Sequence, residues 1–123
     1  MGITPARFVD KPWGNEEIFA ETTSYVGKIL FIRAGEALSL QFHERKEETL
    51  RVLDGEVEVV LGEDISRLKT SYLQPGAVFH VAPRELHRMV ATTDCHLLEV
   101  STNELDDVVR LEDRYGREGT SKP

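Results

Sequence analysis

Short apolar runs separated by turn-forming residues follow one another along most of this chain. The runs cover residues 17–21, 24–33, 37–43, 48–53, 56–61, 67–73, 77–82, 87–91 and 96–100. Runs of this length, with a turn roughly every 8–12 residues, are typical of strands in an all-β sandwich or barrel. The Asp54–Gly55 pair between two runs is a strong hairpin signal. Residues 8–14 are expected to be irregular, because Pro12 removes a backbone donor and Gly14 favours a turn.

One segment near the C-terminus has the spacing of a helix. Its apolar residues recur at about 3.6 positions, Thr102 or Asn103 can cap it, and acidic residues favour its first turn. The apolar stripe consists of Leu105, Val108, Val109 and Leu111, and the acidic residues are Glu104, Asp106 and Asp107. Gly116 would end this short C-terminal helix. We therefore expect one domain over residues 1–117, followed by a mobile polar tail over 118–123.

Four polar side chains have the pattern of a metal site. Gln41 and His43 are two residues apart in a predicted strand, so they share one face. Glu48 opens the next run on the face of its apolar neighbours, and His87 follows a later turn and a short strand. Two nitrogens and two oxygens suit one divalent ion, with Zn preferred and Mn, Fe, Ni or Co as alternatives. The other two histidines, His80 and His96, fit no ligand spacing, although His80 shares strand parity with residues that could line a cavity.

Composition and charge exclude several classes of protein. The net charge is −7, from 22 acidic and 15 basic residues, which argues against non-specific nucleic-acid binding. No apolar run approaches the roughly 20 residues that cross a bilayer. The first residues lack the apolar core of a signal peptide, and a single Cys95 excludes an internal disulfide, so a cytoplasmic location is expected. An anionic small ligand would need a local basic pocket, for which Lys28, Arg33, Arg84 and Arg88 are the candidates. Lys28 shares parity with Leu30 and Ile32 and is expected to point inward.

The spacing of these residues resembles that of the cupin superfamily. Gly35, Gln41, His43, Glu48 and Gly55 reproduce the first cupin motif, with Gln41 where most cupins carry histidine. Residues 76–91 keep the spacing of the second motif around His87 but not most of its residue types. The resemblance implies an all-β cupin jelly-roll barrel, also called a double-stranded β-helix.

Within the cupins, the chain resembles the C-terminal isomerase domain of type II mannose-6-phosphate isomerase/mannose-1-phosphate guanylyltransferase. The resemblance runs over residues 11–117 and is carried by Lys11–Gly14, Gly35–His43, His87–Arg88, Leu98–Val100 and Asp106–Arg117. It implies a homodimeric, metal-dependent sugar-phosphate aldose–ketose isomerase that stabilises an enediolate. No segment resembles the guanylyltransferase domain, so guanylyl transfer is not expected of this polypeptide.

The resemblance leaves the chemistry open at several positions. Lys28 and Arg88 are candidates for holding a substrate phosphate, and His80, Glu44, Glu47 or a metal-bound water for the base. Where the family has a histidine-rich turn and a His-Trp pair, this chain has Glu44, Arg45, Thr49 and Leu50. These departures change the pocket wall more than the metal ligands. A non-catalytic sugar- or metal-binding module, or a metallocupin of another reaction class such as an Fe oxygenase, therefore remain alternatives.

Overall fold

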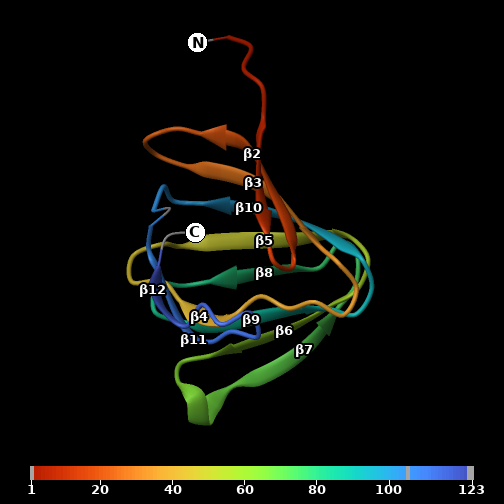
Figure 1. Cartoon of the computed structure of the whole chain (residues 1–123), viewed down its shortest axis with the longest axis vertical. Coiled ribbons are helices and arrows are strands. Elements are labelled where there is room, and N and C mark those ends of the chain that lie inside the picture. Colours follow the sequence, from red (N-terminus) through yellow and green to blue (C-terminus); the bar gives the residue numbers. More distant parts are fainter. Residues whose placement is uncertain (1, 105, 122–123) are drawn as a thin grey trace.

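The protein folds into two six-stranded antiparallel sheets that face each other, as seen in a computed structural model (Figure 1). The structure describes residues 2–104 and 106–121. The first sheet has the order β1-β2-β3-β10-β5-β8 and the second β12-β11-β4-β9-β6-β7. The strands are β1 (Arg7–Lys11), β2 (Gly14–Glu21), β3 (Val26–Ile32), β4 (Leu40–Phe42), β5 (Glu48–Asp54), β6 (Val57–Gly62), β7 (Lys69–Leu73), β8 (Val78–Val81), β9 (Leu86–Ala91), β10 (Cys95–Ser101), β11 (Val108–Glu112) and β12 (Gly119–Ser121). The all-β prediction is confirmed.

Two local predictions were wrong because strand pairing decided them. Residues 7–11 form β1 and pair with β2, and Pro12 stays outside this ladder at the tip of the connection. The turn at Gly55 exists, with a left-handed φ of 75°, but it does not close a hairpin. Strand β5 pairs with β8 and β10, whereas β6 pairs with β7 and β9, so the turn carries the chain from one sheet to the other.

The predicted C-terminal helix is also wrong. Val108–Glu112 is a strand that pairs with β4 on one side and with β12 on the other. Two consecutive β-branched valines favour this conformation, and the edge of β4 supplies the hydrogen bonds that a helix would have made internally. Gly119–Ser121 forms β12 within the segment that was expected to be a mobile tail. Leu105 of the predicted stripe and residues 122–123 of the tail lie outside the described residues.

The interior has an apolar part and a polar part. In the first sheet, Leu97 pairs with Leu30 on β3 and with Val52 on β5, and all three are buried. Two residues further along the same strand, Glu99 pairs with Lys28. Because alternate residues of a strand share a face, these charged side chains point inward beside the apolar ones. The polar part is where a functional site can form.

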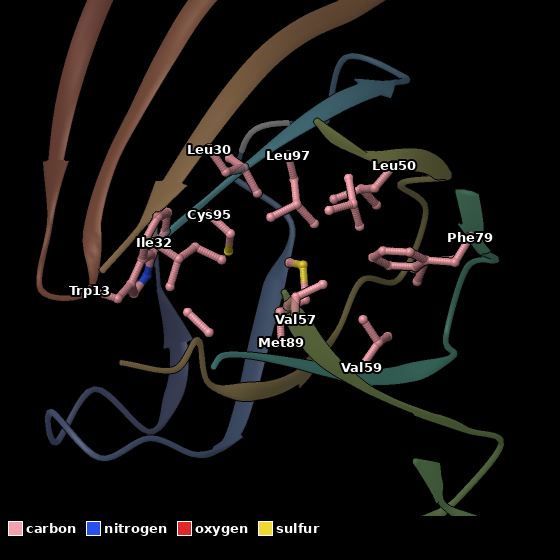
Figure 2. Close-up of a cluster of buried hydrophobic side chains, with 13 residues drawn as sticks. Trp13, Leu30, Ile32, Leu50, Val57, Val59, Phe79, Met89, Cys95 and Leu97 are labelled. Atoms are coloured by element: carbon pink, nitrogen blue, oxygen red, sulfur yellow. The ribbon is translucent and has the colours of Figure 1, made fainter. Parts of the chain in front are cut away.

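The apolar part is filled from both sheets. Leu30, Leu50 and Leu97 from the first sheet meet Val57 and Met89 from the second (Figure 2). Cys95 is buried in the same cluster, and burial raises the pKa of its thiol to about 11, so it has a packing role. Among the described residues, no helix is long and apolar enough to span a membrane.

Candidate metal centre

Two histidines and one glutamate meet inside the barrel. One ligand atom from each of His43, Glu48 and His87 lies within 4.8 Å of the others, and the residues are only 6%, 3% and 2% exposed. His43 directly follows β4, Glu48 begins β5, and His87 lies on β9, where it pairs with Gln41. The structure therefore brings together three of the four residues that the sequence selected as ligands.

Both imidazole rings are oriented by backbone carbonyl groups. The Nδ1 atom of His43 is hydrogen-bonded to the carbonyl oxygen of Asp107, and that of His87 to the carbonyl oxygen of Glu85 at 3.1 Å. The Nε2 atoms then face the carboxylate of Glu48, at 3.4 Å for His43 and 4.0 Å for His87. A histidine ligand commonly donates its second ring N–H in this way, which fixes the tautomer that leaves the other nitrogen free to bind a metal.

The turn that positions His43 is held by two groups from distant segments. The carboxylate of Asp107 accepts hydrogen bonds from the backbone N–H groups of Glu44, Arg45 and Lys46 at 3.0, 2.7 and 2.9 Å. The backbone N–H of Arg84 donates to the His43 carbonyl oxygen at 2.6 Å. Arg84 has a φ of 68°, a left-handed conformation that is unfavourable for a residue with a side chain. This strain is consistent with a role of the Arg84 turn in placing His43.

The protonation states of the cluster suit a metal ion. Burial would raise the pKa of Glu48, but the Lys46 ammonium and the His43 hydrogen bond outweigh it, so the pKa lies well below its usual range. Burial lowers the pKa of His87 to about 4, which leaves a neutral imidazole at pH 7. The Oε2 atom of Glu48 lies 3.4 Å from His43 Nε2 and 3.1 Å from Lys46 Nζ. An anionic carboxylate such as Glu48 and a neutral imidazole such as His87 are the forms that bind a divalent cation, so these residues fit such an ion.

A buried lysine connects this cluster to a second glutamate. Lys46 Nζ lies 3.1 Å from Glu48 Oε2 and 3.0 Å from Glu99 Oε2. Burial lowers the pKa of Lys46, but the two carboxylates raise it more, so the lysine stays charged. Lys46 and Glu99 were not selected from the sequence. Glu99 could have been found, because it shares strand parity with the buried Leu97, whereas Lys46 lies in a turn that has no periodicity.

Of the other residues predicted for the site, two line the cavity and two lie on the outer faces of the sheets. Gln41 lines the same cavity, with its amide nitrogen donating to Ser39 Oγ at 3.0 Å. Lys28 points inward as predicted and pairs with Glu16 at 3.1 Å.

Arg88 alternates with the inward His87 and Met89, so it lies on the outer face and pairs with Glu112 at 3.0 Å. His80 is also outside, within 3.1 Å of Glu47. Arg88 and His80 therefore do not line the cavity.

The cavity beside the cluster is lined by many charges. It has a volume of about 60 Å³ and contains five basic and four acidic side chains. These are Lys11, Lys28, Lys46, Arg110, Arg117, Glu16, Glu48, Glu99 and Glu104. Lys11 was missed because its segment was expected to be irregular. Arg110 was missed because a helix was predicted there, whereas its inward orientation follows from a strand in which it shares a face with the buried Val108 and alternates with Val109 and Leu111.

The segment 113–117 docks on the barrel. Arg114 Nη1 donates to the Gly35 carbonyl oxygen at 2.6 Å, and the Tyr115 hydroxyl donates to Glu36. Arg117 pairs with Asp113 at 2.8 Å and lines the cavity. The docking places one cation of this segment at the site.

Sequence comparison identifies relatives over nearly the whole chain. Residues 4–113 match the family described as mannose-6-phosphate isomerase C-terminal. The mannose-1-phosphate guanylyltransferase of Escherichia coli strain K12 is 32% identical over 118 residues, which cover 90% of this chain and 23% of that protein. The chain thus spans about a quarter of the length of this relative.

Comparison with solved structures identifies the fold. An RmlC-like cupin from Shewanella frigidimarina superposes with a TM-score of 0.70 and 18% identity, over 80% of this chain and 85% of that one. Bacillus subtilis oxalate decarboxylase, a protein with Mn(II) centres, superposes with a TM-score of 0.73 and 16% identity, over 85% of this chain and 29% of that one. These likenesses show a cupin jelly-roll barrel.

Proposed function

This chain belongs to the mannose-6-phosphate isomerase C-terminal family, and from that membership we propose that it is a metal-dependent sugar-phosphate aldose–ketose isomerase. The observation that carries the proposal is the buried cluster of His43, Glu48 and His87, with both Nε2 atoms turned toward the carboxylate. Gln41, which lines the same cavity, would be the fourth ligand. A bound divalent ion would polarise the sugar carbonyl and stabilise the negative charge that develops on its oxygens.

The ion is proposed to be Zn, with Mn as the first alternative. A site with two imidazoles, one carboxylate and one amide oxygen suits Zn but discriminates only weakly against Mn, Fe, Ni and Co. Mn gains support because the structurally similar oxalate decarboxylase contains Mn(II) centres. The substrate is proposed to be a phosphorylated sugar, which follows from the name of the family rather than from the shape of the cavity.

Glu99 is the best candidate for the base that moves the proton between C1 and C2. His80 and Glu47 pair with each other on the outside of the barrel, and Glu44 is half-exposed beside Arg84. Glu99 instead lines the cavity, and its Oε2 atom pairs with Lys46 Nζ at 3.0 Å. A base must reach the proton it abstracts, so position decides between these carboxylates before pKa does. Glu99 would take the proton on its carboxylate, and Lys46, which pairs with Oε2, would hold that carboxylate in place.

The test is an isomerisation assay on protein loaded with one metal at a time. Zn- or Mn-loaded protein is expected to interconvert mannose 6-phosphate and fructose 6-phosphate, or an aldose and ketose pentose phosphate, and metal-stripped protein is expected to lose this turnover. Glu99→Gln should keep its metal but lose turnover, because the amide cannot accept the proton. No turnover on any of these sugar phosphates at full metal occupancy would reject the isomerase, and metal-dependent oxygen consumption would instead indicate an oxygenase.

One observation favours a non-catalytic binding module as the second candidate. A cavity volume of about 60 Å³ is small beside the roughly 300–1,000 Å³ of typical pockets for small-molecule ligands. A sugar phosphate would therefore have to bind at the mouth of the cavity or widen it. If a sugar phosphate raises the melting temperature of metal-loaded protein without any turnover, the binding module is the better description.

A homodimer formed through the first sheet is part of this proposal. The outer face of that sheet carries the exposed apolar side chains of Phe8, Phe19, Val78 and Val100, from four different strands. These side chains are spread across the sheet from β1 at one edge to β8 at the other, and a two-fold pair would cover this face with the same face of a second copy. Sedimentation should show a dimer for the wild type and a monomer for Val100→Glu; a monomeric wild type contradicts the interface.

The cytoplasmic location stays a prediction.

A further inference from the structure

Arg110 is a buried cation that lines the cavity without an acceptor for its Nε group. The side chain comes from β11, is 6% exposed, and faces inward in register with Gln41 of β4. Its Nε atom has no hydrogen-bond partner among the described residues. Buried charged donors are almost always satisfied, because an unpaired one is unfavourable. An arginine kept in this state indicates that an acceptor from outside the chain binds here.

Three more cations surround Arg110 in the same cavity, and we call the four residues the cationic cluster. They are Lys11, Lys28, Arg110 and Arg117. Lys28 pairs with Glu16 and Arg117 with Asp113. Burial lowers the pKa of Lys11, Glu16 opposes this shift, and the charges of Lys28, Arg110 and Arg117 lower it further. The side chains are therefore close enough to repel one another.

The cationic cluster has the chemistry of a phosphate-binding site. The five basic and four acidic side chains that line the cavity leave an excess of one positive charge, and the carboxylates that act on Arg110 are Glu16 and Asp113. A phosphomonoester carries about −1.5 to −2 charges at pH 7 and accepts several hydrogen bonds, which an arginine fork can supply in pairs. We propose that the cationic cluster binds the phosphate of a phosphomonoester, with Arg110 and Lys11 as its direct contacts. As an assignment of the substrate's phosphate, this rests on the proposed isomerase function.

The strand order places Arg110 beside Gln41, the proposed fourth ligand, and two strands away from His87. Arg110 pairs with Gln41, and Gln41 pairs with His87, so Arg110 and His87 lie on strands two apart. Neighbouring strands are about 4.8 Å apart, so the two backbones are separated by about 10 Å. A sugar whose C1 and C2 oxygens lie at His43, Glu48 and His87 would then carry its phosphate at the opposite end of the carbon chain. The geometry therefore favours sugar 5- or 6-phosphates over 1-phosphates.

The experiment measures anion binding separately from turnover. Metal-free protein is titrated calorimetrically with inorganic phosphate and with mannose 6-phosphate, and zinc affinity is measured in parallel. Arg110→Gln is expected to weaken binding of both anions about 10- to 100-fold, the loss of a charge-assisted hydrogen bond, while zinc affinity is unchanged. Mannose and mannose 1-phosphate should bind the wild type more weakly than mannose 6-phosphate.

Two further variants keep the result interpretable. Lys11→Gln changes a half-buried residue, which tolerates substitution better than Arg110, and should also weaken phosphate binding. Arg51→Gln removes an exposed arginine on the outer face of β5 and should bind phosphate like the wild type. If Arg110→Gln and Lys11→Gln both bind phosphate as tightly as Arg51→Gln, the subsite is wrong.

The failure of this subsite and that of the isomerase are distinguishable. Phosphate binding that depends on Arg110 in a wild type without turnover would support the subsite and reject the isomerase. If the wild type turns over and its Arg110→Gln variant keeps the same KM for mannose 6-phosphate, the isomerase is supported and the subsite is rejected.

Discussion

The Glu48→Gln variant is expected to lose metal binding and, with it, any isomerase activity. Glu48 is the single carboxylate of the ligand cluster, and its low pKa keeps it anionic at neutral pH. Glutamine keeps the size of the side chain but removes the charge that attracts the cation. Because loss of a partner that only orients a ligand costs about 10- to 100-fold in metal affinity, loss of the charged ligand itself should cost at least about 100-fold.

The measurement is the metal content of purified protein, followed by a competitive zinc titration. Glu47→Gln is the matched control, because Glu47 is the preceding residue but pairs with His80 outside the barrel. The control should bind zinc like the wild type. If Glu48→Gln retains one zinc per chain with unchanged affinity, Glu48 is not a metal ligand. The metal centre would then no longer support the proposed function.

The second large effect is a loss of stability in Lys46→Met. In the wild type the ammonium of Lys46 lies about equally close to Glu48 and Glu99, and all three side chains are almost fully buried. Methionine fills a similar volume but leaves two carboxylates facing each other without a cation. Breaking a buried ion pair in this way costs about 3–5 kcal/mol, because the remaining charge is not compensated.

Urea unfolding of metal-free protein measures this cost, and Arg45→Met is the control. Arg45 is the neighbouring residue of the same turn, and its pair with Glu104 is exposed, so the control should lose less than about 1 kcal/mol. Zinc should stabilise Lys46→Met more than it stabilises the wild type, because the ion neutralises the carboxylate that the lysine no longer serves. Equal stability of Lys46→Met and Arg45→Met would show that the lysine does not support the two glutamates.

The three clustered ligand candidates were accessible from the sequence because each lies at the start or end of a strand whose parity is visible. Glu48 shares a face with Leu50 and Val52, and the structure buries all three. The same reasoning failed for His80, because its neighbour Val78 is apolar but exposed. It also misplaced Arg88, which follows a ligand in sequence and therefore points to the opposite side of the sheet.

By itself, the sequence determined the strand-rich architecture, the inward faces of the central strands, and the spacing that places His43, Glu48 and His87 in one family pattern. These features are local, since alternation along a strand needs no knowledge of its partners. Only the tertiary structure decided that residues 108–112 form a strand and that Arg110, Lys11 and Arg117 share a cavity with the histidines. The physical reason is that unpaired strand edges and buried charges are satisfied by other segments of the chain, and the periodicity within one segment does not specify which segments pair.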